Sequence, residues 1–192
     1  AHYKGCVGGR PEIVSEIIRR HPSPGRRVKR HPARPAGRIA STRMLEKAQG
    51  TLLGQLAGDS LGSLVEFRTA DDIAEAYPNG VRDLAPGGTW NLLAGQPTDD
   101  SEMALALARS ICAEGGFDAD KVGKAYVAWG RSSPFDIGNT TSQGLAAISG
   151  RGRANITSQA NGALMRVSPI GIANAGRPGL AAKQAAEDAA LT

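Results

Sequence analysis

Apolar residues recur at steps of three and four over most of the chain, which is the spacing of one face of an α-helix. A first long helix is predicted after Ser41 or Thr42, either of which can cap its N-terminus. Its apolar positions are Leu45, Ala48, Leu52, Leu53 and Leu56. A short helix over 71–77 is predicted behind the N-cap Thr69 and before the turn Pro78-Asn79-Gly80. Further helices are predicted over 12–20, 99–113, 118–129, 140–148 and 178–190.

Strand-like alternation is weak and is confined to two short stretches, 81–84 and 170–173. The helix over 99–113 is expected to close at Gly115-Gly116, where glycine can end a helix. Aromatic residues make up only 4% of the chain, so a core must be packed from Ala, Leu, Ile and Val. The pattern predicts an all-α fold, an orthogonal multi-helix domain in which the loops between helices carry the function.

Charge is distributed unevenly along the chain. Residues 1–50 contain 12 Lys and Arg against 3 Asp and Glu, a net charge of +9, whereas residues 51–192 contain 11 against 15, a net charge of −4. The stretch 21–38 is rich in Arg and Pro and almost free of apolar residues, so it cannot bury enough surface to order itself. We therefore predict a flexible, basic, Pro/Arg-rich extension over 1–40 and a helical domain over 41–192.

The basic stretch has two interpretations. It is either an arm for nucleic acid or another anionic surface, or a solvated linker. No aromatic residue is interleaved in it as a stacking platform, which favours the linker, so nucleic acid is not expected as a partner. The chain shows no apolar segment suited to secretion or membrane insertion, so we expect a cytoplasmic protein without a membrane partner.

The residue types of the helical domain exclude several kinds of catalytic site. All three His residues lie within the first 31 positions, so the domain cannot form a Ser-His-Asp, a Cys-His or a His-based zinc site from its own residues. Cys6 and Cys112 are far apart in sequence, and Cys112 is expected to be a buried free thiol. Chemistry in the domain must therefore rest on carboxylates, hydroxyls, a metal ion or backbone amides.

One short run of acids, Thr98-Asp99-Asp100-Ser101, stands where a loop enters the predicted helix over 99–113. Adjacent carboxylates flanked by hydroxyls offer hard oxygen ligands, which suit Mg²⁺, Mn²⁺ or Ca²⁺. The same run is also a good helix start, because Thr98 can serve as the N-cap and the acids face the positive end of the helix dipole. The residues of this run by themselves leave both interpretations open.

Four motifs in a fixed order resemble the ADP-ribosylglycohydrolase family over about residues 44–192. They are Gly58-Asp59-Ser60-Leu61-Gly62-Ser63-Leu64-Val65-Glu66, then Thr98-Asp99-Asp100-Ser101, then Phe135-Asp136-Ile137-Gly138-Asn139-Thr140-Thr141, then Asn161-Gly162-Ala163-Leu164-Met165-Arg166-Val167-Ser168-Pro169-Ile170-Gly171. The resemblance implies an all-α hydrolase that holds two Mg²⁺ or Mn²⁺ ions and cleaves ADP-ribosyl glycosidic bonds. Its substrate would be an ADP-ribosylated protein side chain or an ADP-ribosyl small molecule, from which it releases ADP-ribose.

The resemblance also assigns roles to residues at matching positions. The implied metal ligands are Thr98, Asp99, Asp100 and Glu66, and the implied catalytic carboxylates are Asp99, Asp100 and Glu66. The implied lining of the ADP-ribose groove is Gly138, Asn161, Gly162, Met165 and Arg166. Asp59 is expected to be structural, holding the helix end or a neighbouring loop. Phe135 is expected either to contact a base or to cap the core.

The chain departs from the family in one respect. The family carries a second acidic motif, Asp-x-Asp followed by Thr or Ser, beyond the region matched here. The chain's own Asp-x-Asp, Asp118-Ala119-Asp120, precedes Lys121 and lies at a predicted helix start. We therefore expect the helical domain to be incomplete at its C-terminus, with an incomplete second metal site. The alternative function is that of a catalytically inactive relative, a regulatory or immunity-type module that binds ADP-ribose or a protein.

Overall fold

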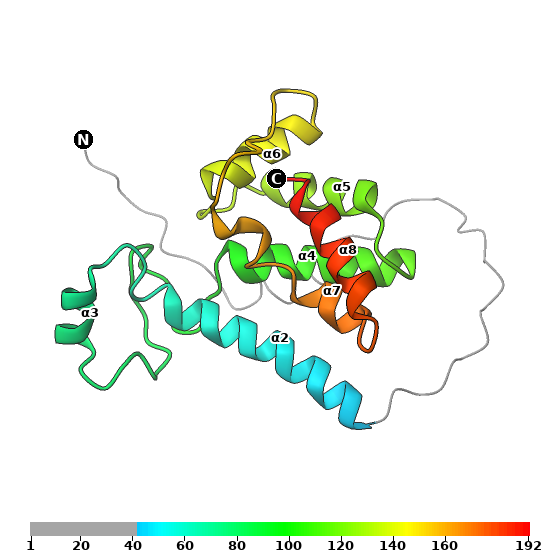
Figure 1. The fold of residues 1–192 in the computed structure, drawn as a ribbon. Coiled ribbons are helices and arrows are strands. Elements are labelled where there is room, and N and C mark those ends of the chain that lie inside the picture. The colour runs from blue at the N-terminus through cyan, green and yellow to red at the C-terminus, as the bar shows by residue number, and fades with distance from the viewer. Residues whose placement is uncertain (1–41) are drawn as a thin grey trace. The chain divides into compact units, whose positions relative to one another are not determined.

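The computed structural model describes residues 42–192, which fold into helices joined by loops (Figure 1). The helices are α2 (Thr42–Gly62), α3 (Ala70–Ala76), α4 (Asp99–Glu114), α5 (Ala119–Gly130), α6 (Asn139–Ile148), the 3₁₀ turn η1 (Asn161–Ala163), α7 (Ser168–Ala173) and α8 (Pro178–Ala189). These described residues contain no strand, and a single β-bridge joins Gly87 and Leu92. The all-α fold predicted from the sequence is confirmed, while the helix predicted over 12–20 lies outside the described residues.

The core is built around α4 and α5, which lie side by side, with α6, α7 and α8 packed against one or both of them (Figure 1). Its fully or almost fully buried apolar side chains are Met103 and Leu107 of α4, Val122 and Tyr126 of α5, Leu145 of α6 and Ile170 of α7. The long helix α2 packs against α4 and α7, and its C-terminal end leads into the loop that carries α3. None of the helices between residues 42 and 192 combines the length and the apolar character that a membrane crossing requires.

Local signals place some of the helix ends. Thr69 and Asp72 form the capping box of α3: the Thr69 hydroxyl accepts the Asp72 N–H at 3.2 Å, and the Asp72 carboxylate accepts the Thr69 N–H at 3.4 Å. Gly115 closes α4 in the left-handed region, with φ of 71°, as the sequence predicted. At these two ends the helix boundary follows from neighbouring residues.

Three expectations from the sequence were wrong. The stretch 170–173 is not a strand but the end of α7, in whose first turn Pro169 fits because it has no N–H that a helix there would use. The stretch 81–84 lies in the loop after α3 and pairs with no strand. Cys112 is exposed and not buried, because the face of α4 that enters the core carries Met103 and Leu107 and position 112 lies off that face.

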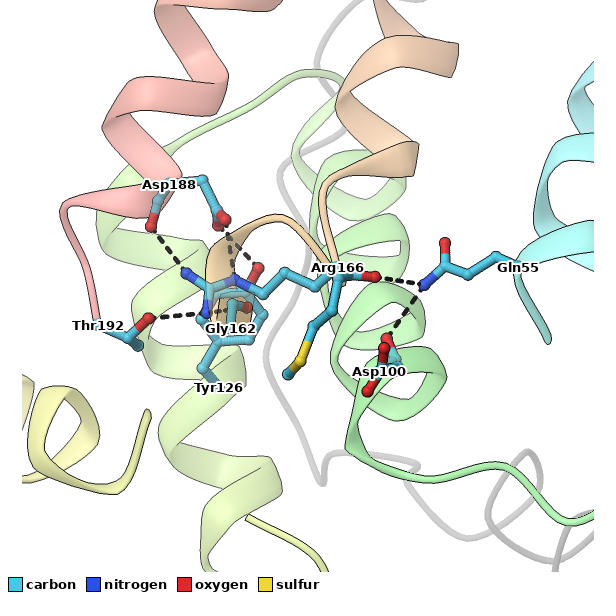
Figure 2. A network of polar contacts seen from close by, with 8 residues as sticks. Gln55, Asp100, Tyr126, Gly162, Arg166, Asp188 and Thr192 are labelled. Atoms are coloured by element: carbon cyan, nitrogen blue, oxygen red, sulfur yellow. Dashed lines mark hydrogen bonds and ion pairs between the residues drawn. The ribbon is translucent and has the colours of Figure 1, made fainter. Parts of the chain in front are cut away.

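A buried ion pair fixes the last helix to the rest of the core (Figure 2). The Nε of Arg166 donates to the carboxylate of Asp188 at 2.8 Å, and both side chains are fully buried. The other guanidinium nitrogens donate to the carbonyls of Asp188 and Gly162 and to the hydroxyl of Thr192, at 2.8 to 3.0 Å. Tyr126 donates its hydroxyl to Asp188 at 2.7 Å, and its ring lies 4.6 Å below the guanidinium. Every buried polar side-chain atom of this network has a hydrogen-bond partner. The network joins α5, α8 and the segment before α7, because its residues come from these three parts of the chain.

We expect Asp188→Asn to lower the free energy of unfolding by about 3 kcal/mol or more, because it leaves a buried guanidinium without its counter-charge. The matched control is Glu187→Gln, the neighbouring residue, which forms an exposed pair with Lys183 at 3.8 Å. This control should stay within about 0.5 kcal/mol of the wild type. Urea unfolding near neutral pH measures both values, and equal losses in the two variants would contradict the stabilising role of the buried pair.

Candidate functional site

The candidate site forms where the C-terminal part of α2 meets the N-terminus of α4. Thr98 stands at the N-cap of α4 in extended backbone geometry, but its own side chain does not cap the helix. The carboxylate of Asp59 does so from α2, accepting the backbone N–H groups of Thr98 at 3.0 Å and Ser101 at 3.1 Å. It also accepts the hydroxyls of Thr98 at 2.7 Å and Ser101 at 2.6 Å. The structural role expected for Asp59 is confirmed, and the acidic turn is anchored to α2.

The two acids that open α4 are held partly away from water. Asp99 is only 8% exposed, and burial together with the charges of Asp136, Asp100 and Asp59 raises the pKa of its carboxyl to about 7. Burial and the charges of Asp59 and Glu66 likewise raise the pKa of Asp100 above its usual range. The run 98–101 is thus both a helix start and a concentration of negative charge.

Asp136 belongs to the same group of acids, although the sequence analysis assigned it no role. Burial and the charges of Glu66, Asp100 and Asp59 raise the pKa of its carboxyl to about 6. Asp136 lies in the loop between α5 and α6, so folding brings it to residues far away in sequence. The available signal was its position inside the quoted run Phe135 to Thr141, just before a helix start. We call Asp59, Glu66, Asp99, Asp100 and Asp136 the acidic cluster.

Two aromatic residues border the acidic cluster. The indole N–H of Trp90 donates to the carboxylate of Glu66 at 3.1 Å. The Thr89 hydroxyl donates to the backbone carbonyl of Glu66 at 2.7 Å, which fixes the loop after α2. The rings of Trp90 and Phe135 are tilted by 59° with centroids 6.1 Å apart. Phe135 is 41% exposed, so it lies at the margin of the cluster and not in the core.

The residues expected to line the ADP-ribose groove fall into two groups. Gly138, the N-cap of α6, lies beside the cluster, because its backbone N–H lowers the pKa of Asp99. Asn161 is exposed, and Gly162 fits closely against α6, where a Cβ would come within 2.9 Å of the Thr141 hydroxyl. The side chain of Met165 instead packs on the core, and Arg166 is fully buried in its ion pair. Arg166 therefore stabilises the segment 161–166 from the core side, where its guanidinium donates to the Gly162 carbonyl at 3.0 Å.

The acidic cluster offers the type of ligand atom that a divalent ion prefers, but too few ligands in one place to complete its coordination shell. Its oxygens are the hard donors that Mg²⁺ and Mn²⁺ prefer, and the carboxylates disfavour one another's ionisation, which a cation would relieve. Between residues 42 and 192, however, no three His, Cys, Asp or Glu side chains come close enough together to hold a metal ion. The described residues thus offer a partial donor set.

The sequence and fold of this chain are similar to those of known proteins. The sequence profile described as ADP-ribosylglycohydrolase matches residues 40–192. The ADP-ribosyl-(dinitrogen reductase) glycohydrolase of Rhodospirillum rubrum is 38% identical over 138 residues, which are 69% of this chain and 46% of that protein. An ADP-ribosylarginine hydrolase of Pseudomonas putida (strain GB-1) is 29% identical across 83% of this chain and 51% of that protein.

A solved chain from an ADP-ribosylglycohydrolase-related protein complex is also similar. It matches with a TM-score of 0.62 and 31% identity, over 76% of this chain and 49% of that one. The chain therefore spans about half the length of the relatives that it matches.

The raised pKa of Asp99 predicts how stability depends on pH in the absence of divalent ions. Between about pH 4 and pH 7 the folded state keeps a proton that the unfolded state, with a pKa of 3.8, has released. The free energy of unfolding should therefore fall as the pH rises through this window and level off above it. Asp99→Asn should flatten this slope, whereas Asp120→Asn, which removes an exposed acid from the first turn of α5, should not.

Denaturant unfolding in EDTA over this pH range measures both slopes. A wild-type slope in the Asp99→Asn variant would show that Asp99 carries no raised pKa.

Proposed function

The chain belongs to the ADP-ribosylglycohydrolase family, and from that premise we propose that it acts in the hydrolysis of the glycosidic bond between ADP-ribose and a protein side chain. The observation that carries the proposal is the acidic cluster, in which Asp59 anchors the turn of Asp99 and Asp100, and burial raises the pKa of Asp99 and Asp136. Carboxylates gathered in this way can stabilise the positive charge that develops on the ribose when a glycosidic bond breaks. Two relatives are named for dinitrogen reductase and for ADP-ribosylarginine, which favours an arginine-linked substrate.

The reaction breaks the bond between the anomeric carbon of the ribose and the side-chain nitrogen and forms a bond from that carbon to a water oxygen. Positive charge develops on the ribose in the transition state, and the carboxylates of Asp100 and Glu66 stabilise it. Asp99 accepts the proton that the attacking water releases, and this proton is then delivered to the departing nitrogen, so that the carboxylate is restored. No histidine is needed for any of these steps, in keeping with a helical domain that has none.

Mg²⁺ or Mn²⁺ is the proposed cofactor, held through Thr98, Asp99 and Asp100 with Glu66 nearby. Thr98 donates its hydroxyl proton to Asp59, which leaves the lone pairs of the hydroxyl oxygen free to face a cation. When bound, such an ion would supply a positive charge able to orient the ribose hydroxyls and to lower the pKa of a water molecule. Because the described residues offer only a partial donor set, we expect weak binding, with water filling the remaining positions.

The proposed ADP-ribose contacts are the backbone-rich segments around Gly138, Asn161 and Gly162. Glycine at two of these positions lets backbone N–H groups approach a diphosphate without a side chain in the way. Phe135, exposed beside the acidic cluster, is available to contact a base. Arg166 contributes by holding the Gly162 carbonyl and not by touching the ligand.

We expect Asp99→Asn and Asp100→Asn each to weaken Mn²⁺ binding by about tenfold or more, since each removes a charged oxygen donor worth more than about 1.4 kcal/mol. Titration calorimetry or water-proton relaxation measures the affinity. Asp120→Asn removes the same charge from another helix start and should bind Mn²⁺ as the wild type does. Wild-type affinity in both site variants would mean that these two acids only begin a helix.

We expect the chain to release free ADP-ribose slowly from an ADP-ribosylarginine peptide, and only when Mg²⁺ or Mn²⁺ is present. The rate should be low because an ion with a partial donor set is poorly fixed, and a misplacement of about 1 Å can cost on the order of 10²-fold. Asp99→Ala should abolish the release, which chromatography of free ADP-ribose measures with and without EDTA. Rapid, EDTA-resistant turnover would overturn the metal-dependent mechanism, and ADP-ribose binding without turnover would favour the inactive, ligand-binding alternative.

A further inference from the structure

A single glutamine in the middle of α2 links the acidic turn to the helical core. The side-chain amide of Gln55 donates one N–H to the backbone carbonyl of Asp100 at 3.1 Å and the other to that of Met165 at 2.9 Å. Figure 2 shows the Gln55 nitrogen directed toward Asp100. The amide oxygen accepts the hydroxyl of Ser168, the first residue of α7. Both donors and the acceptor of Gln55 are therefore in use.

The orientation of this amide follows from its surroundings. If the oxygen and nitrogen of Gln55 exchanged places, the oxygen would face the carbonyls of Asp100 and Met165, three acceptors with no proton among them. The two carbonyls, which can only accept, therefore set the orientation of the amide. In this orientation the amide oxygen faces Ser168 and accepts its hydroxyl as a third contact.

Gln55 acts on a part of the turn that Asp59 leaves unsupported. Asp59 holds the N–H groups at Thr98 and Ser101, whereas Gln55 holds the carbonyl of Asp100, the residue between them. The second anchor of Gln55, the carbonyl of Met165, directly precedes Arg166, whose side chain is fixed by its buried ion pair. The backbone of the acidic turn is thereby tied to the segment that carries the buried ion pair (Figure 2).

We propose that Gln55 is a positioning residue of the acidic cluster: its amide fixes the backbone at Asp100, and so the place of the Asp100 carboxylate relative to Asp99 and Glu66. Gln55 contacts the Asp100 backbone and not its carboxylate, so it acts through Asp100. The proposal rests on the proposed function for its effect on turnover, but not for its effect on the turn itself. Loss of the two donors lets the turn shift, and small displacements of reacting groups lower rates on the order of 10²-fold per 1 Å.

The test compares Gln55→Met with a matched control, Gln184→Met. Methionine keeps the length and approximate shape of glutamine but lacks the two N–H donors. Gln184 on α8 likewise accepts a hydrogen bond from a buried side chain, Asn174 at 2.6 Å, but it forms no hydrogen bond with the acidic cluster. A third variant, Ser168→Ala, removes only the hydroxyl that donates to the Gln55 amide oxygen.

The first measurement needs neither metal nor substrate. Hydrogen exchange of the backbone amides over 98–104 should be at least about fivefold faster in Gln55→Met, with Ser168→Ala between this variant and the wild type. Exchange over 120–128 in α5 reports global unfolding and should change no more than in Gln184→Met. A uniform acceleration over both segments, or none over 98–104, would overturn the proposal by showing a general stabilising role or no role.

The second measurement follows Mn²⁺ affinity and ADP-ribose release. Gln55→Met should lower turnover by about tenfold or more with little change in KM, and weaken Mn²⁺ binding, while Gln184→Met retains wild-type values. If the wild type itself neither binds Mn²⁺ nor releases ADP-ribose, the proposed function fails, and the exchange data still decide the role of Gln55. Local acceleration over 98–104 with unchanged turnover in an active protein would overturn the positioning role.

Discussion

The site depends on one carboxylate that is placed to serve two helices. Asp59 belongs to α2, yet it satisfies the N–H groups at the start of α4, which would otherwise need a cap within their own segment. Its negative charge also faces the positive end of the α4 dipole, together with Asp99 and Asp100. This favourable field offsets part of the repulsion among the acids. The same anchor brings the loop of Glu66 and the acidic turn into one place, so that the charges of Asp59 and Glu66 add to burial in raising the pKa of Asp100.

Much of the fold could be predicted from local sequence, because long helices are recognisable from periodic apolar positions and from the residues at their ends. The helices α2, α3, α4, α5, α6 and α8 were predicted in this way with ends within a few residues. The exception is α7, which has six residues and therefore less than two turns of periodicity. Ile170 and its apolar neighbours resembled a strand, and only packing against α4 and α2 makes this segment helical.

The site was predicted less completely because its members meet only in three dimensions. Thr98, Asp99, Asp100 and Glu66 lie in recognisable motifs, and the structure supports a common acidic cluster through their mutual charge effects. Asp136 was overlooked because nothing in its own loop shows which carboxylates it will face. Arg166 gave the opposite difficulty: a charged residue in a motif suggested ligand contact, whereas its partner Asp188 lies 22 residues further on and draws it into the core. Gln55 carried no sequence signal, since its three partners come from distant segments.

The buried pair of Arg166 and Asp188 has a consequence for how this sequence can change over time. Loss of either charge alone leaves the other stranded in the core, whereas replacement of both by apolar residues of similar volume is often tolerated. The two positions are therefore expected to show strong epistasis: a substitution that is harmful in one background becomes neutral once its partner has changed. Because Tyr126 and Thr192 bond to the same two side chains, such a change has to pass through a set of positions and not one, which makes the pair slow to evolve.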